Sequence, residues 1–200
     1  MKTTDLPAVF STGRKTILRP INKATDIPKI VRWINDPEIR YYVGHYLPAT
    51  FESERTWPEK LDSDDKNIVF AIEAKSKRGS PGRFIGVMGL HGINWKDRTV
   101  MTGALIGDKR YWGNGYGTDA KMQVLNYAFN ELNMHKVVSF VYDYNERSFR
   151  YLLRCGYKVE GKQRQHVFRQ GAYHDNVILG VLREEWLPIW RRYQKTGKVR

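Results

Sequence analysis

Cysteine is nearly absent from this sequence of 200 residues, in which Cys155 is the only example. A single cysteine excludes an internal disulfide framework and any zinc site built from several cysteines, and it is typical of a reducing compartment. Long apolar runs are also missing: no stretch reaches membrane-spanning length, and residues 1 to 20 contain no apolar core of signal-peptide length. We therefore expect a cytoplasmic protein with no membrane partner.

Internal repeats, low-complexity segments and linker-like stretches are lacking as well. A chain of 200 residues is long enough for one well-cored domain and short for two. Its hydrophobic content of 41% is typical of a globular protein rather than a disordered one. The sequence therefore predicts one domain over residues 1–200, with a basic C-terminal tail over about residues 194–200.

Acidic residues are too few to balance the basic ones. The 34 Lys and Arg exceed the 21 Asp and Glu, which gives a formal net charge of +13. Such a surplus favours polyanions, including nucleic acid and phosphorylated cofactors, and it repels free polycations at long range. Because the basic residues are scattered through the chain, the charge alone neither selects nor excludes a nucleic-acid partner.

Hydrophobic patterning predicts strands interleaved with helices. Strand patterns occupy residues 16–20, 67–74, 84–90, 100–107, 135–142, 157–167 and 173–182. A first helix capped by Thr25 or Asp26, a second after residue 117, a short one from Glu146 and a last one over residues 183–193, interrupted by Pro188, complete the order. This order predicts an α/β (α+β) fold with one mixed, mostly antiparallel sheet of six to seven strands and helices on both faces.

Three glycines, Gly113, Gly115 and Gly117, lie within five residues between a predicted strand and an amphipathic helix. Glycine tolerates positive φ and lets the backbone approach a ligand closely. The first turn of a helix adds unpaired N–H groups and the positive end of the helix dipole. The stretch therefore predicts an anion site, best suited to phosphate, although a glycine-rich turn before an ordinary helix would read the same way.

Two motifs in this order resemble those of the GNAT superfamily of N-acetyltransferases. The stretch Arg110-Tyr-Trp-Gly-Asn-Gly-Tyr-Gly-Thr118 is similar to the family's acetyl-CoA signature, R/Q-x-x-G-x-G/A. Residues 145–157, which read NERSFRYLLRCGY, look like the family's N-x-x-S-(x)7-G-F/Y segment. The sequences WINDPEIRYYVG and GAYHDNVILGVLREEW resemble the branch with RimJ/RimL-type protein N-terminal acetyltransferases and spermidine acetyltransferases.

The resemblance implies that acetyl-CoA binds across the glycine turn and the two strands beside it. Its diphosphate would meet the backbone of the turn, while its pantetheine arm would lie between the strand that ends at Ile106 and the strand that begins near Lys136. A main-chain N–H near residues 105–107 would stabilise the oxyanion. The cofactor-binding residues that it implies are Ile106, Arg110, Tyr111, Trp112, Gly113, Asn114, Gly115, Tyr116, Gly117, Thr118, Asn145, Ser148 and Arg150. Asn145 and Ser148 are also explained by simple helix capping.

The family's usual acid and base are missing from their positions. Leu152 stands where many relatives carry the acid tyrosine, and Met101 stands where relatives often carry a glutamate. The candidate catalytic residues are therefore Tyr151 and Asn145, with Tyr142 or Tyr144 as alternative acids. Ordered water could remove the proton, or a base could lie between residues 36 and 59, where the candidate substrate-binding residues are Asp36, Glu38, His45 and Glu52.

Acids interleaved with aromatic residues in the segment 36–59 suit a cationic amine. A protein or peptide N-terminus is the first hypothesis for the acceptor, followed by a polyamine such as spermidine and by an aminoglycoside-type amine. A domain that lacks both usual acid-base groups could also bind acetyl-CoA without turnover, or associate with nucleic acid. Relatives are often dimers, so the resemblance makes a homodimer possible.

Overall fold

The structure, a computed structural model, describes residues 8–55, 65–76 and 82–199. Its centre is an eight-stranded sheet with the strand order β1-β2-β3-β4-β5-β6-β8-β7. The predicted mixed sheet with helices on both faces is confirmed, and the strand beyond the predicted six to seven is the two-residue β1. The strands are β1 Ser11–Thr12, β2 Thr16–Arg19, β3 Asn67–Ala74, β4 Arg83–Asn94, β5 Thr99–Ile106, β6 Lys136–Tyr142, β7 Lys158–Arg169 and β8 Ala172–Leu182.

Neighbouring strands are antiparallel everywhere except between β5 and β6. These two parallel strands pair over three positions only, Thr99 with Lys136, Val100 with Val137 and Met101 with Val138. Beyond them β5 stays paired with β4 as far as Ile106, and β6 stays paired with β8 as far as Tyr142. The sheet is therefore split between β5 and β6 over the second half of both strands.

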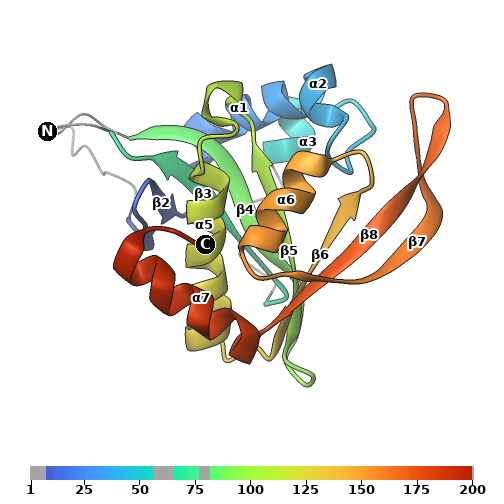
Figure 1. The fold of residues 1–200 in the computed structure, drawn as a ribbon. Coiled ribbons are helices and arrows are strands. Elements are labelled where there is room, and N and C mark those ends of the chain that lie inside the picture. The colour runs from blue at the N-terminus through green and yellow to red at the C-terminus, as the bar shows by residue number, and fades with distance from the viewer. Residues whose placement is uncertain (1–7, 56–64, 77–81, 200) are drawn as a thin grey trace, which may run out of the picture.

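Helices cover both faces of the sheet (Figure 1). The helices are α1 Lys23–Asn35, α2 Pro37–Arg40, α3 Phe51–Arg55, the 3₁₀ turn η1 Lys109–Tyr111, α5 Tyr116–Asn126, the π-helical turn η2 Tyr127–Glu131, α6 Glu146–Arg154 and α7 Arg183–Thr196. The larger core lies under α5, α6 and α7, while α1 packs on the opposite face against Ala71 and Phe84. In the described part of the chain, no helix is both long and apolar enough to cross a membrane.

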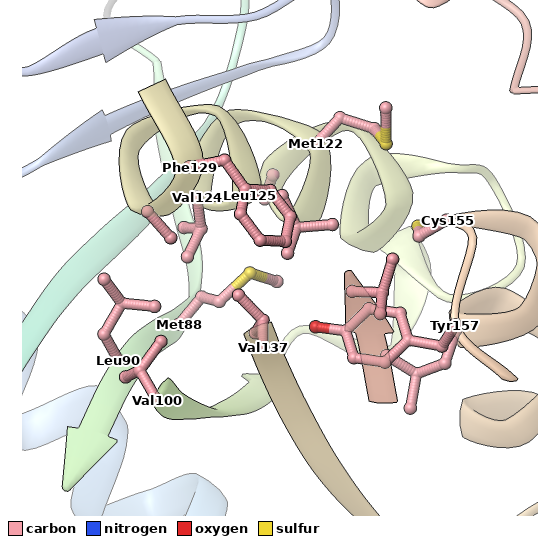
Figure 2. Packing of buried hydrophobic residues seen from close by; sticks show 14 of the residues in the cluster. Met88, Leu90, Val100, Met122, Val124, Leu125, Phe129, Val137, Cys155 and Tyr157 are labelled. Carbon is pink, nitrogen blue, oxygen red and sulfur yellow. The ribbon is translucent and has the colours of Figure 1, made fainter. Parts of the chain in front are cut away.

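The larger core forms where α5 and η2 lie on the sheet. Figure 2 shows Val124, Leu125 and Phe129 directed toward Met88 and Val137 on the strands. All five side chains are at most 1% exposed. Burial of each contributes about 1.5–3 kcal/mol, so the helical spacing that predicted an apolar face also fixes α5 on the sheet over β4 and β6.

Two predicted helix boundaries were wrong. The first helix is capped by Asn22, whose Oδ1 accepts the N–H groups of Ala24 and Thr25 at 3.0 and 3.2 Å. Asp26 cannot cap because its carboxylate binds the buried Arg19 guanidinium, with an N–O distance of 2.6 Å.

The last helix is not interrupted by Pro188. It continues to Thr196, because Trp186 and Tyr193 are buried on either side of the proline and hold both halves against the core. Helix α7 therefore also includes residues 194–196, which the sequence analysis assigned to the basic tail.

Asp119, in the first turn of α5, does not cap its own helix. Its buried carboxylate accepts the backbone N–H groups of Arg14, Lys15 and Thr16 at 2.9, 3.0 and 2.8 Å. The Tyr193 hydroxyl on α7 also donates to it. One carboxylate thus joins the β1–β2 turn, α5 and α7, and fixes the start of α5 relative to the sheet.

We predict that Asp119→Asn lowers the free energy of unfolding by roughly 2–4 kcal/mol. The NH₂ group of the asparagine amide is a donor, and it would face buried N–H groups that are donors too. Urea unfolding measures the change. Glu131→Gln, at an exposed position in η2, controls for the loss of a carboxylate and should stay within about 0.5 kcal/mol of the wild type. Equal stability of both variants would show that the buried network contributes nothing.

Candidate active site

The split between β5 and β6 leaves backbone groups without a strand partner. The Ser139 hydroxyl donates to the Thr102 carbonyl at 3.1 Å, so this carbonyl faces β6. In a strand, alternate residues direct their N–H and C=O groups to the same side, so Ala104 and Ile106 also face the gap. The Ile106 carbonyl accepts the Trp112 Nε1–H at 2.6 Å. The edge of β5 therefore offers N–H groups to a ligand that enters the split.

A cavity of about 720 Å³ passes through this split and is bordered by both faces of the sheet. On the side of α5 and α6 its wall includes Gly113, Gly115, Gly117, Thr118, Asn145, Ser148 and Tyr151. On the side of α1 and α2 it includes Ile39, Tyr42, His45, Val87, His91, Leu105 and Tyr142. Two molecules can therefore approach each other through the sheet from opposite faces.

The glycine turn forms the entrance on the α5 side. Gly113 and Gly115 have φ values of +74° and +82°, which side-chain-bearing residues rarely adopt. Gly115 is the N-cap of α5, and no side chain caps the first N–H groups of this helix. A Cβ on Gly117 would lie 3.8 Å from the Ile106 side chain. These unpaired N–H groups at the positive end of the helix dipole suit a diphosphate, as expected for coenzyme A.

Four of the predicted cofactor residues lie outside the cavity wall: Arg110, Asn114, Tyr116 and Arg150. The Arg110 guanidinium binds both oxygens of Asp108 at 2.9 and 2.7 Å, which raises its pKa and lowers that of Asp108. Arg150 forms an exposed ion pair with Glu146. Both guanidinium groups are thus occupied by carboxylates of their own elements.

Arg147 lies on the cavity wall instead, and the sequence analysis missed it. Its guanidinium carbon is 3.7 Å from the centre of the Trp112 ring and 5.3 Å from that of Tyr42. Trp112 belongs to the glycine turn and Tyr42 follows α2, so this stacked cation links the two sides of the cavity. Trp112 and Arg147 lie in two separate motifs, so no local sequence pattern indicates that they are in contact.

Asn145 and Ser148 both line the cavity. The Asn145 Oδ1 accepts the Ser148 N–H at 3.1 Å, so Asn145 is the N-cap of α6. Capping fixes the Asn145 side chain at the end of β6, beside the split. Asn145 can therefore cap α6 and also contact a ligand in the cavity, so the two explanations from the sequence do not exclude each other.

The three candidate tyrosines have different surroundings. Tyr151 lines the cavity, and burial raises its pKa well above the ordinary value, so its hydroxyl stays protonated and able to donate. The Tyr144 hydroxyl donates to the Tyr41 carbonyl at 2.8 Å, and burial raises its pKa too. Tyr142 lines the cavity from β6. Leu152, by contrast, is fully buried in the core.

The acidic residues of the acceptor segment are not on the cavity wall. Lys109 binds Asp36 and Glu38 at 2.8 and 2.6 Å, and its hydrogen bond lowers the pKa of Asp36. Glu52 is exposed on α3. His45 does line the cavity, and its buried Nε2 has no hydrogen-bond partner among the described residues. Trp57, Glu59 and the rest of residues 56–64 lie outside the described residues.

No carboxylate lines the cavity among residues 8–55, 65–76 and 82–199. The only full charges on the wall in these ranges are those of Arg147 and Arg154. The same ranges contain no group of three or more His, Cys, Asp and Glu residues that could hold a metal ion. The chemistry that the described side chains supply is therefore that of hydroxyl, imidazole, amide and guanidinium groups.

Lys121 lies behind Tyr151, with its Nζ 5.9 Å from the ring centres of Tyr151 and Tyr157. The ammonium group is fully buried and has no hydrogen-bond partner in the part of the chain that the structure describes. Burial lowers the pKa of Lys121 to about 7. A buried amine of this kind costs stability whenever it is protonated.

We predict that Lys121→Met stabilises the protein at pH 6, and that the gain shrinks as the pH rises from 7 toward 10.5. The pKa is about 7 in the folded state and about 10.5 when unfolded, so between these values the unfolded chain binds more protons and wild-type stability rises with pH. Chemical unfolding at several pH values measures this. Lys195→Met, at an exposed position in α7, should show no such trend; the same pH dependence in both variants would contradict the assignment.

We predict that Gly115→Val weakens acetyl-CoA binding at least tenfold, because the side chain strains the turn and crowds its N–H groups. Gly171→Val is the matched control, since Gly171 has the same φ of +82° at the tip of the β7–β8 hairpin. It should bind acetyl-CoA normally in titration calorimetry. An affinity of Gly115→Val within about threefold of the wild type would place the diphosphate elsewhere.

Known proteins are similar to this chain in sequence and in fold. The sequence model of the Acetyltransferase (GNAT) domain family matches residues 15–158. The SPbeta prophage-derived uncharacterized N-acetyltransferase YokL of Bacillus subtilis is 26% identical over 90% of this chain and 97% of its own length. The "Putative ribosomal N-acetyltransferase YdaF" of Bacillus subtilis is 32% identical over 52% of this chain and 57% of its own length. The structure of the spermidine N-acetyltransferase of Vibrio cholerae in complex with CoA and spermine matches with a TM-score of 0.78 and 23% sequence identity. The match covers 86% of this chain and 98% of that one.

The family match covers the split, the glycine turn and α6, which build most of the cavity; the part of the wall on β7 and β8 lies outside the match. The chain therefore belongs to the GNAT acetyltransferase family and is an N-acetyltransferase, and acetyl-CoA is the acetyl donor of this family.

Proposed function

We propose that this N-acetyltransferase acetylates the α-amine of a protein or peptide N-terminus. The observation that carries the proposal is the composition of the cavity wall on the α1 side. There, tyrosines, aliphatic residues and histidines surround the approach to the split, with no carboxylate among the described residues. An acceptor with several positive charges needs anionic partners when it leaves water. A single α-amine carries at most one positive charge and loses it before it reacts.

The acidity of the acceptor amine supports the same choice. An α-amine has a pKa of about 8, and a lysine-like amine has a pKa of about 10.4. At neutral pH an appreciable fraction of an N-terminus is already neutral and nucleophilic. The guanidinium groups of Arg147 and Arg154 on the cavity wall, together with the net charge of +13, oppose a polycation further.

The donor would occupy the other half of the cavity. The N–H groups of the glycine turn and of the first turn of α5 would bind the coenzyme A diphosphate. Ala104 and Ile106 would bond the pantetheine amides like an added strand. Tyr151, whose hydroxyl stays protonated, would donate a hydrogen bond to the departing sulfur.

A polyamine is the second candidate, and the fold similarity to the spermidine N-acetyltransferase of Vibrio cholerae favours it. The name of YdaF, "Putative ribosomal N-acetyltransferase", favours a protein acceptor.

We expect peptides with free N-termini to be acetylated with a kcat/KM at least tenfold above that of spermidine. Steady-state assays of coenzyme A release with a peptide library and with spermidine measure the ratio. Mass spectrometry then locates the acetyl group, which should lie on the α-amine rather than on a lysine of the same peptide. N-formylated versions of the same peptides are the blocked controls. A higher kcat/KM for spermidine would reject the peptide acceptor.

A further inference from the structure

His91 lies on the α1 side of the split, and two glycines leave room for its imidazole ring. It is on β4, where Gly89 precedes it by two residues, and Gly103 on β5 pairs with Gly89. A Cβ on Gly89 would lie 2.8 Å from the His91 Nε2, and a Cβ on Gly103 would lie 3.3 Å from the same atom. The ring therefore lies along the sheet over two glycines, and a side chain at Gly89 would collide with it.

Asn67 determines which ring nitrogen of His91 carries the proton. Asn67 pairs with His91 across β3 and β4, and its Oδ1 is 3.2 Å from the His91 Nδ1. The Gly92 N–H also points to this Oδ1, at 3.4 Å. A backbone N–H can only donate, which identifies the atom as the amide oxygen and makes Nδ1 a donor. Nε2 is then the unprotonated nitrogen with a free lone pair.

This lone pair lies close to where the two strands separate. The last β5–β6 pair is Met101 with Val138, and Gly103 follows two residues later on β5. His91 and Gly103 both line the cavity that passes through the split. His91 therefore borders the part of the cavity that an amine would enter from the α1 side.

The surroundings keep the imidazole neutral. Burial lowers the pKa of His91, and the positive charge of Lys121 on α5 lowers it further. The other titratable and charged groups on the same cavity wall include Tyr142, Tyr151, His45, His166, Arg147 and Arg154. No carboxylate on the described wall opposes the two arginines.

We propose that His91 is the general base, and that its Nε2 takes one proton from the acceptor ammonium. The neutral amine then attacks the thioester carbonyl carbon, so that a C–N bond forms as the C–S bond breaks. The nitrogen loses a second proton, the departing sulfur receives one, and the products are the acetamide and the free thiol. His91 returns its proton to solvent. This inference rests on the proposed transfer to an α-amine.

The kinetic test is His91→Gln, because glutamine keeps a polar group over the glycines but cannot take the proton. We expect kcat at pH 7 to fall by about 10²-fold, with acetyl-CoA affinity unchanged. The defect should shrink as the pH rises above the acceptor pKa, where solution supplies the neutral amine. His135→Gln, at an exposed position before β6 and outside this cavity, is the matched control and should retain wild-type kinetics. A pH-independent defect, or none, would overturn the role of His91.

The structural test needs no acceptor and no donor. Two-bond proton–nitrogen NMR spectra of the free protein should show the His91 Nδ1 protonated and Nε2 unprotonated at pH 7. In Asn67→Leu this preference should weaken, and kcat should fall with little change in acceptor KM. The opposite tautomer in the wild type would reject the proposal. If peptides proved not to be acceptors while His91→Gln still lost transfer to another amine in the same pH-dependent way, the acceptor assignment would fail and the base would stand.

Discussion

The parallel pairing of β5 with β6 ends after three residues, and the rest of the site depends on this early end. A buried strand edge normally costs free energy because its N–H and C=O groups lose their partners. Here Ser139 and Trp112 satisfy two of the carbonyls, on Thr102 and Ile106, from within the chain. The remaining groups face a cavity that reaches both sides of the sheet. The split therefore serves as a binding edge and as the passage between donor and acceptor.

The two helices beside the split are held by contacts made away from the cavity. Asp119 anchors the start of α5 to residues 14–16 and to Tyr193, so the glycine turn does not need to cap the helix itself. Asn145 caps α6, which sets the direction of Tyr151 and Arg147 into the same cavity. Lys109 and Arg110 are paired with carboxylates, which leaves the backbone of the turn as the anion site.

The sequence was sufficient where the signal is local. Strand-type hydrophobic patterns predicted β2 to β8, and three glycines before an amphipathic helix predicted the turn that borders the cavity. It failed where one side chain has two possible partners, because a local pattern does not rank them: Asp26 was a plausible cap, yet its carboxylate binds Arg19, and Asn22 caps the helix. Arg150 and Arg147 look alike in sequence, yet one meets Glu146 and the other meets Trp112 on another element. His91 depends on Gly103 and Asn67, which only the sheet register brings together.

The proposed acceptor and the proposed base support each other through proton affinities. A histidine of ordinary pKa, about 6.5, takes a proton from an α-amine of pKa about 8 at a cost of about 2 kcal/mol, and from a lysine-like amine at about 5 kcal/mol. Burial lowers the pKa of His91, which increases both costs. The smaller cost lies below the gain from general base catalysis, which is 10²–10⁴-fold or about 3–5 kcal/mol, whereas the larger one cancels most of that gain. The described part of the wall holds no carboxylate, which leaves the imidazole weakly basic and gives a polycation no counter-charge, so one feature of the cavity favours both an N-terminal amine and a neutral histidine.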